Sequence, residues 1–373
     1  TPRPSRAFSV RDPQVGAQGA DRPSRSCPVM KLTPGELYFI GEDDPDEGSR
    51  TPFVKIGIVK EHEDRSIDDR LGEHQTGNPR RLRELHIEAS PAVERIETLL
   101  HAEFAPCRVG GEWFHLPDPE LEMVIERATV HINEATAGLP ELQAAENLNA
   151  KMSNGQRLTP DSATLGLHRR LLDVRTQVVE AEGMVERIRE ALVEAAGGVT
   201  EGSPYFRVEL RAGRTNFDGT AFTAAYPELA ERYTIERNAV SRRFGLFGQK
   251  NHVCDVREDN PALFRHLAEV KRSLEAGEPP GELHRQYLEL LALRGPLDWE
   301  QDLLEARLRF VCQEHEEVVG VCRWKREAVT RQTLDTTVLR NEQSDLYEQF
   351  LSKDEDKPLA IVNRHLGYRL PPG

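Results

Sequence analysis

Apolar and polar residues alternate along three stretches near the start of the chain, which is the pattern of half-buried strands. The first two, 36–40 and 53–59, are joined by a polar, acidic loop and predict a hairpin. The third, 82–87, predicts a further strand. We therefore expect a sheet of three strands in this part of the chain.

Apolar residues three and four apart predict two helices that alternate with these strands. Ser66 is a suitable N-cap for a helix over 66–76, and Pro91 marks the start of a second helix. The second helix carries an apolar stripe of Val93, Ile96, Leu100 and Phe104. The order β-β-α-β-α predicts an α/β (α+β) domain over 30–135, with a three-stranded antiparallel sheet flanked by helices.

The rest of the chain is expected to be mostly α-helical. Residues 110–114 suggest a short hairpin and 118–135 a helix, whereas 136–160 are rich in Ala, Asn, Gly and Pro and predict a linker. Residues 1–29 are rich in Pro, Arg, Ser and Gly, so we expect a disordered tail and exclude it from the fold.

Two segments of the C-terminal region resemble each other, which predicts an internal duplication. Leu167-His168-Arg169-Arg170-Leu171-Leu172 is similar to Leu283-His284-Arg285-Gln286-Tyr287-Leu288, at an offset of 116 residues. Later matches, such as Phe217-Asp218 with Leu334-Asp335, lie 117 residues apart. We therefore expect helical modules over 161–240 and 281–355, a linker over 241–280 and a tail over 356–373.

Composition and charge narrow the possible functions. The chain has 49 basic and 63 acidic residues, a net charge of −14, and a mean hydropathy of −0.58. No apolar run approaches the roughly 20 residues of a membrane span, so no membrane partner is expected. The five cysteines are an odd number without a C-x-x-C pair, which favours a reduced, cytoplasmic location over a disulfide framework.

Polar residues in the first domain are placed where they could meet on one face of the small sheet. Two lie on the paired strands, and the others form pairs one helical turn apart, a spacing that puts both members on one side of a helix. They are Tyr38 and Lys55 on the strands, Arg70 and His74 on the first helix, and Glu97 and His101 on the second.

These positions resemble the GIY-YIG nuclease superfamily, and more closely its branch named after a phage T5 open reading frame, whose second motif reads K-I-G. The resemblance covers about a quarter of the chain. Its motifs are Leu37-Tyr38-Phe39-Ile40, Lys55-Ile56-Gly57, Arg70-Leu71-x-x-His74, Glu97-x-x-Leu100-His101 with Phe104, and Gly111-Glu112-Trp113-Phe114-x-Leu116. Lys55 replaces the second tyrosine of the founding pattern, and a late asparagine has no clear counterpart, which leaves one phosphate contact unassigned.

The resemblance implies a cytoplasmic endonuclease that depends on Mg²⁺ (or Mn²⁺) and cuts DNA, in phage defence or mobile-element biology. Glu97 would hold the metal and Arg70 the phosphate. Tyr38 would take a proton from water if Lys55 lowered the pKa of its phenol, and His74 would be a relay or an alternative base. His101 would hold Glu97 in position, or would only pack against its neighbours. Glu112 and Trp113 are expected to be structural.

Basic residues elsewhere could contact nucleic acid, although residues 30–127 hold 12 basic and 22 acidic side chains. Arg80, Arg81 and Arg83 follow the first helix and could track a phosphate backbone, or could simply be solvated. The duplicated region also carries basic side chains that suit either nucleic acid or a protein partner, including self-association through 161–355. They are Arg207, Arg211, Arg214, Arg323, Lys325, Arg326 and Arg331, with Trp324 among them.

A rival interpretation is a binding module that uses a nuclease-like fold to hold nucleic acid or a protein without cutting. Tyr38, Arg70 and Glu97 together favour the enzyme, because a pure binder has no need of all three.

Overall fold

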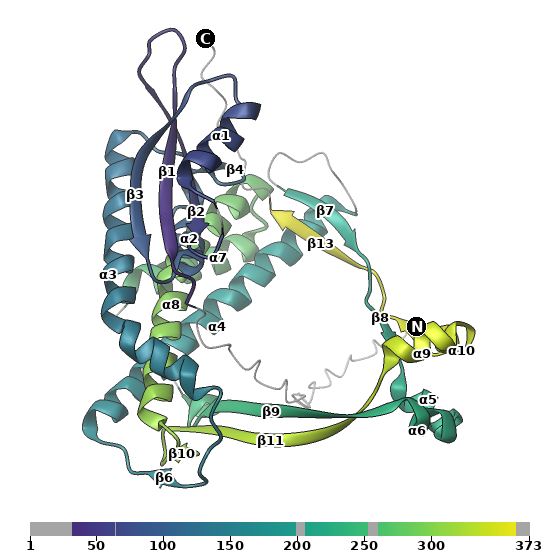
Figure 1. Ribbon diagram of the computed structural model, residues 1–373. Helices are drawn as coiled ribbons and strands as arrows, with labels where there is room; N and C mark the ends of the chain where they lie inside the picture. The colour runs from purple at the N-terminus through teal and green to yellow at the C-terminus, as the bar shows by residue number, and fades with distance from the viewer. Residues whose placement is uncertain (1–31, 64, 199–205, 253–259, 363–373) are drawn as a thin grey trace, which may run out of the picture.

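The computed structural model describes residues 32–63, 65–198, 206–252 and 260–362. The tail expected over 1–29 lies outside them. An N-terminal α/β domain packs on long helices, from which two ribbons of paired strands extend to a tip of short helices (Figure 1).

The N-terminal domain contains the three antiparallel strands that the sequence predicts. They are β1 (Gly35–Asp43), β2 (Arg50–Lys60) and β3 (Leu82–Ser90), with β1 in the centre. Two short strands, β4 (Arg108–Gly110) and β5 (Trp113–His115), enlarge the sheet to the order β3-β1-β2-β5-β4. Gly111 joins them at a φ of +53°, a left-handed conformation that glycine adopts without strain.

Alternate residues of β1 pack on opposite faces of this sheet, as the period of two requires. Leu37 and Phe39 face α2 (Val93–Glu103) and α3 (Asp118–Leu148), whereas Tyr38 and Ile40 face α1 (Ile67–Gly77). Ser66 caps α1 as predicted, because its hydroxyl accepts a hydrogen bond from the Asp69 N–H and the Asp69 carboxylate bonds back. The domain is thus a sheet between helices.

The linker expected over 136–160 is wrong for 136–148, because α3 continues to Leu148 with Pro140 inside it. A proline ends a helix only if nothing offsets the lost hydrogen bond. Here Leu142 and Ala145 continue the buried stripe of α3 into the domain core, and Glu134 accepts a hydrogen bond of 2.8 Å from the Trp299 indole. A two-residue strand, β6 (Arg157–Leu158), follows.

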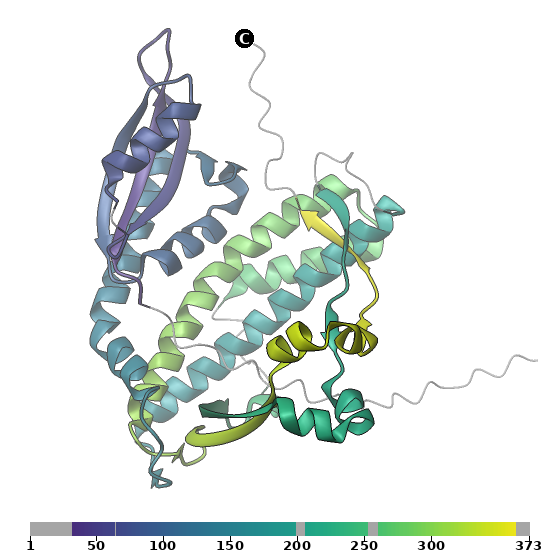
Figure 2. The same cartoon turned by 45° about the vertical axis from the view of Figure 1, so that its right-hand side comes forward.

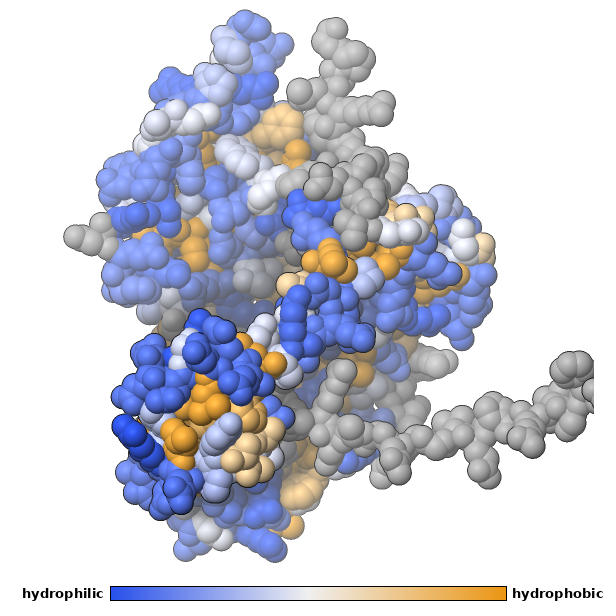
Figure 3. All heavy atoms as spheres, turned by 90° about the vertical axis from the view of Figure 1, so that its right-hand side faces the viewer, coloured by the Kyte–Doolittle hydropathy of each residue, from blue (hydrophilic) through white to orange (hydrophobic). Residues whose placement is uncertain are grey.

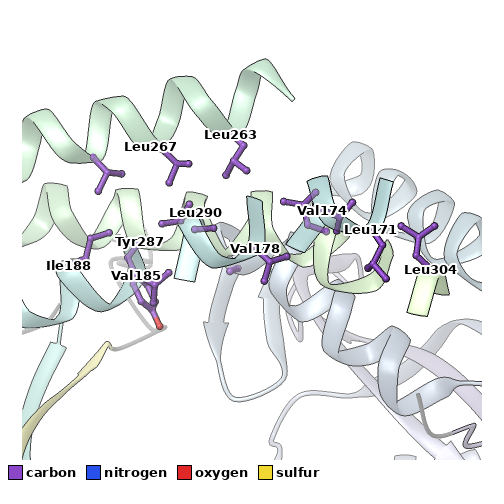
Figure 4. Packing of buried hydrophobic residues seen from close by; sticks show 14 of the residues in the cluster. Leu171, Val174, Val178, Val185, Ile188, Leu263, Leu267, Tyr287, Leu290 and Leu304 are labelled. Atoms are coloured by element: carbon purple, nitrogen blue, oxygen red, sulfur yellow. The ribbon is translucent and has the colours of Figure 1, made fainter. Parts of the chain in front are cut away.

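Three helices form the second core: α4 (Ser162–Ala196), α7 (Pro261–Ala276) and α8 (Pro280–Cys312). Their aliphatic side chains interdigitate, with Leu263 and Leu267 of α7 above the α4–α8 pair (Figure 4). Bonds from Arg170 to Glu300 (2.7 Å) and from Arg189 to Tyr287 (2.9 Å) show that α4 and α8 run antiparallel. The linker expected over 241–280 is therefore wrong for 261–276, which the apolar stripe of α7 holds in the core.

The duplication is visible in the order of elements. The first copy continues with β7 (Phe206–Arg211), β8 (Thr215–Phe217), α5 (Gly219–Ala225), α6 (Pro227–Tyr233) and β9 (Thr234–Leu246). The second continues with β10 (Glu317–Val318), β11 (Cys322–Leu334), α9 (Thr336–Glu342), α10 (Ser344–Gln349), β12 (Leu351–Lys353) and β13 (Lys357–Val362). Asp218 and Asp335, 117 residues apart, N-cap α5 and α9 with their side chains.

The two copies exchange strands. The strand after the short helices of the first copy, β9, pairs with β11 before those of the second, while β8 and β7 pair with β12 and β13 (Figures 1 and 2). Backbone hydrogen bonds repeat this reciprocity: Asp335 N–H donates to Tyr233 (2.8 Å) and Asp218 N–H donates to Phe350 (2.9 Å). The expected tail over 356–373 is thus a strand at 357–362, and the copies are not two separate helical modules.

The short helices of both copies meet at the end of the ribbons and form the helical tip. Its core contains Phe222, Tyr233 and Leu339, against which Phe217 stacks on Tyr347 at 4.5 Å between ring centroids. Apolar side chains also reach the surface on this side of the molecule, amid hydrophilic ones (Figure 3). The core of the helical tip is therefore built from short helices of both copies.

The N-terminal domain shares its core with α8. Trp299 and Ala306 belong to the same apolar cluster as Leu99 and Leu100 of α2. At Gly295 the two helices approach so closely that a Cβ would lie 3.1 Å from the Ala102 Cβ. Among the helices described, none combines the length and apolar content that crossing a bilayer requires.

Candidate active site

The candidate residues gather at a free strand edge. Strand β5 pairs with β2 only at Phe53–Lys55, and the Ile56 N–H then donates to the Glu112 carbonyl oxygen (3.0 Å). Beyond Ile56 no described strand pairs with this edge of β2, and side chains of α1 and α2 border it instead. A pocket of about 510 Å³ opens there, which we call the edge pocket. It is lined by Tyr38, Ile58, Lys60, Glu63, Arg70, His74, Glu94, Glu97, Thr98 and Glu112.

Tyr38 reaches the edge pocket across Gly57, its cross-strand partner. A Cβ at Gly57 would lie 2.5 Å from the Tyr38 hydroxyl oxygen, so only glycine leaves room for the ring. Most of the tyrosine is buried between the sheet and α1, and its hydroxyl lies 3.4 Å from His74 Nε2. The glycine of the second motif thus makes room for the tyrosine of the first motif.

The surroundings of Tyr38 do not favour a phenolate. Burial, followed by the charge of Glu112, raises the pKa of Tyr38 to about 12, although Arg70 acts in the opposite direction. The Lys55 ammonium is paired with the Glu112 carboxylate, so the positive charge of the lysine is offset beside the tyrosine. The expectation that Lys55 makes Tyr38 a base is therefore not supported, and the hydroxyl stays protonated near neutral pH.

The pKa of His74 is shifted in the opposite direction from that of Tyr38. Burial, together with the positive charges of Lys55 and Arg70, lowers the pKa of its imidazole below the ordinary 6.5. The ring is therefore mostly neutral at pH 7 and has a nitrogen free to accept a proton. Of the two side chains, His74 is better suited to act as a base.

Arg70 points a guanidinium into the edge pocket with its hydrogen bonding incomplete. Its terminal nitrogens make long contacts with Glu63 (3.5 Å) and Glu73 (3.4 Å). Its Nε is buried and has no hydrogen-bond partner among the described residues. A buried donor without a partner is costly, and an oxyanion at this position would satisfy it.

Glu97 lies where α2 borders the edge pocket. Burial, and next the charge of Glu112, raise the pKa of Glu97 to about 7. For Glu112, burial would also raise the pKa, but the hydrogen bond and charge of Lys55 outweigh it and keep the pKa below its usual value. Of these two carboxylates, Glu112 is therefore the well-ionised one, and Glu97 is one that a nearby cation would help to ionise.

Glu112 is a functional candidate for which the sequence predicted only a structural role. The turn at Gly111 places it opposite Lys55, where it pairs with the ammonium and lines the edge pocket. Its place in the Gly111-Glu112-Trp113-Phe114 motif was the available signal. Trp113 meets the expectation, since it packs beside Tyr38 and Ile40 in the smaller core.

The other predicted residues take different positions. The His101 ring contacts the Ile56 carbonyl oxygen at 3.2 Å and so ties α2 to the strand of the second motif. Arg80 and Arg83 pair with Glu42 (3.0 Å) and Asp43 (2.9 Å) and do not line the edge pocket. Arg80 borders a neighbouring hollow of about 890 Å³ that shares His74 with the edge pocket, while Arg81 is exposed.

The residues present suit a hard divalent cation that keeps most of its waters. Lys60, Arg70 and the Lys55 that pairs with Glu112 only offset the carboxylates at the edge pocket, so a further cation is needed to offset the charge of an entering phosphodiester. Within the described ranges no group of three or more His, Cys, Asp or Glu side chains could enclose a metal. Mg²⁺ does not need such a cage, because one or two carboxylates and water suffice. Glu97 and Glu112 are the carboxylates in place for it.

Comparison with known proteins finds a family that matches the N-terminal domain. The model of a family described as T5orf172 domain matches residues 35–129, which include the whole sheet and every residue of the edge pocket. No curated protein and no solved structure matches the chain. The match indicates a nuclease-like or nucleic-acid-binding module in the N-terminal part of the chain.

Proposed function

We propose that the N-terminal domain is a GIY-YIG-type endonuclease that hydrolyses phosphodiester bonds in DNA with the help of Mg²⁺ or Mn²⁺. One observation carries the proposal: Tyr38, Arg70, His74 and Glu97, from β1, α1 and α2, line a single pocket. The family match over the same residues supports it. The resemblance adds phage defence or mobile-element biology as the setting.

Hydrolysis of a phosphodiester needs a base for the attacking water and positive charge on the phosphate. In the edge pocket, the neutral imidazole of His74 would accept the proton of the water. For this, His74 Nε2–H would donate to the oxygen of the protonated Tyr38, 3.4 Å away, which orients the ring and leaves Nδ1 to accept the proton. The Tyr38 hydroxyl would donate its own hydrogen to the substrate.

Arg70 would bind the phosphate oxygens that gain charge as the bond breaks. Its planar fork suits two oxygens at once, and its buried Nε has no competing partner in the described chain. Glu97 and Glu112 would hold the metal ion. A divalent ion there supplies Lewis-acid stabilisation of negative charge on the reacting phosphate.

The test is cleavage of supercoiled plasmid DNA by the full chain with Mg²⁺, with and without a chelator. Arg70→Ala is compared with Arg65→Ala, because Arg65 also pairs with Glu73 (3.6 Å) but does not line the edge pocket. We expect Arg70→Ala to lose on the order of 10²-fold or more in single-turnover rate with nearly unchanged DNA binding. Arg65→Ala should stay within about twofold of the native rate.

Two results would contradict the proposal. One is cleavage that persists in the chelator, which would show that the reaction needs no metal ion. The other is a chain that binds DNA without cutting it under any divalent ion, with the Arg70→Ala loss confined to affinity, which would make the domain a binding module.

A further inference from the structure

Cations face each other along the ribbon of β9 and β11. In its register Arg237 lies opposite Arg331, Arg243 opposite Lys325, and Arg242 opposite Arg326. Side chains directly opposite on two antiparallel strands have Cβ atoms about 5 Å apart, and like charges in such positions destabilise the pairing. The three opposed pairs thus each carry a cost in stability.

One of these pairs has a structural role. Arg326 is buried, stacks on Trp324 at 3.9 Å, and donates to the Leu148 (2.8 Å) and Gln313 carbonyl oxygens. Arg242 donates to the Asn149 carbonyl oxygen (2.9 Å). These two arginines fasten the base of the ribbon to the end of α3.

The other two pairs share the opposite face. Residues 237, 243, 325 and 331 alternate with Phe244 and Trp324, which turn toward the helical core, so the four cations turn away from it. Arg237, Arg243 and Arg331 are exposed, and none of them has an ion pair within 4 Å in the part of the chain that is described. Lys325 pairs with Glu327, and Arg323 on the same face pairs with Glu316.

The duplication supplies an internal comparison. The β9–β11 ribbon, residues 234–246 and 322–334, holds seven basic and two acidic residues, a net charge of +5 in a chain of −14. The equivalent ribbon, residues 206–217 and 351–362, holds five basic and four acidic residues, a net charge of +1. The excess of cations therefore belongs to one ribbon and is not a property of the repeat.

We propose that the exposed face of the β9–β11 ribbon binds duplex DNA through its phosphates. A two-stranded ribbon fits the major groove of B-DNA. The pairs Arg237–Arg331 and Arg243–Lys325 are six residues apart, or about 20 Å along the strands, which matches the rise of about six base pairs. The cations would then reach phosphates at two places along the groove. The proposal shares its ligand with the proposed nuclease but does not depend on cleavage.

The experiment measures binding of a fluorescent 30-base-pair duplex to the full chain in chelator, over a series of salt concentrations. The test variant is Arg237→Gln with Arg331→Gln. The matched control is Arg211→Gln with Lys357→Gln, which removes an opposed pair of cations from the equivalent ribbon. Arg237→Lys with Arg331→Lys keeps the charge and should keep the affinity.

We expect the test variant to lose tenfold or more in affinity at about 0.1 M salt, with a salt slope lower by about two. The control should change less than twofold. The melting temperature of the test variant should stay level or rise, because two opposed charges are gone.

An unchanged affinity, or a loss equal to that of the control, would overturn the proposal. An equal loss of affinity for a single strand of the same length would also overturn the proposal, because binding would then not depend on the groove of a duplex. A changed oligomeric state with unchanged DNA affinity would assign the face to a protein contact instead. Cleavage at saturating DNA should persist in the test variant, so a failed ribbon and a failed nuclease give different results.

Discussion

The Tyr38 ring passes over the Cα of Gly57, where a Cβ would lie 2.5 Å from the phenolic oxygen. Gly57→Ala should therefore displace the tyrosine from His74, with a cost of about 1–3 kcal/mol in the free energy of unfolding and a matching loss of cleavage. Chemical denaturation and single-turnover cleavage measure both. Gly72→Ala in α1, where nothing lies within 4 Å, is the control. Full stability and activity in Gly57→Ala would contradict this account of the motif.

Glu97 should make the stability of the chain depend on pH. Its pKa is raised from 4.5 to about 7 in the folded chain, so the folded state binds this proton more tightly than the unfolded state. The resulting stability is present below pH 4.5 and is lost as the pH rises through 7. Glu97→Gln, which mimics the protonated form, should therefore be neutral at pH 4.5. In chelator at pH 8 it should stabilise by about 1–2 kcal/mol, after allowance for solvent screening.

Urea unfolding at the two pH values checks this, with Glu122→Gln on the exposed side of α3 as the control. The same Glu97→Gln variant should lose cleavage by on the order of 10²-fold or more, because a carboxylate ligand is gone. Equal stability of native chain and variant at both pH values would show that Glu97 is not perturbed.

The roles of Tyr38 and His74 can be separated by their pH profiles. If His74 is the base, His74→Ala should slow cleavage by about 10²-fold or more, because general-base catalysis contributes this much. Tyr38→Phe should cost about tenfold and leave the shape of the profile unchanged, since a phenol with a pKa of about 12 does not titrate in the working range. A Tyr38→Phe variant that loses the alkaline limb of the profile would restore tyrosine as the base.

The N-terminal domain should depend on α8. A fragment of residues 30–150 would expose Leu99 and Leu100 of α2, where Trp299 and Ala306 now cover the core. We expect it to bind a hydrophobic dye and to unfold at lower denaturant than the same domain in the full chain. Amide exchange in α2 and α3 measures the difference. Protection equal to that of the full chain would show that the domain folds alone.

The N-terminal domain was the most predictable part because its signals are local. Alternation along β1, the Ser66 cap and the apolar stripe of α2 each lie within a few residues of one another. The spacing of Arg70 with His74 along α1 likewise places both on the edge pocket. Features that depend only on nearby residues can thus be predicted from a short stretch of sequence.

The predictions that were wrong concern features that depend on residues far away in the chain. Pro140 and its neighbours resemble a linker until α8 buries their apolar side. Strand β9 lies nearly ninety residues from its partner β11, so neither strand's sequence shows that they pair. The pairing of Lys55 with Glu112 likewise crosses 57 residues, and it brings to Tyr38 a carboxylate that raises its pKa, where the sequence predicted a lysine that would lower it.

The strand exchange between the two copies has the geometry of a symmetric dimer. Thr234 pairs with Leu334 and Phe217 with Leu351, so each contact is repeated with the roles of the copies reversed, as in an isologous interface between identical subunits. Here one covalent chain holds both subunits, which are therefore always present in equal amounts. Identical subunits must keep identical surfaces, but fused ones can diverge, and this explains how one ribbon carries a net charge of +5 while its counterpart stays near neutral.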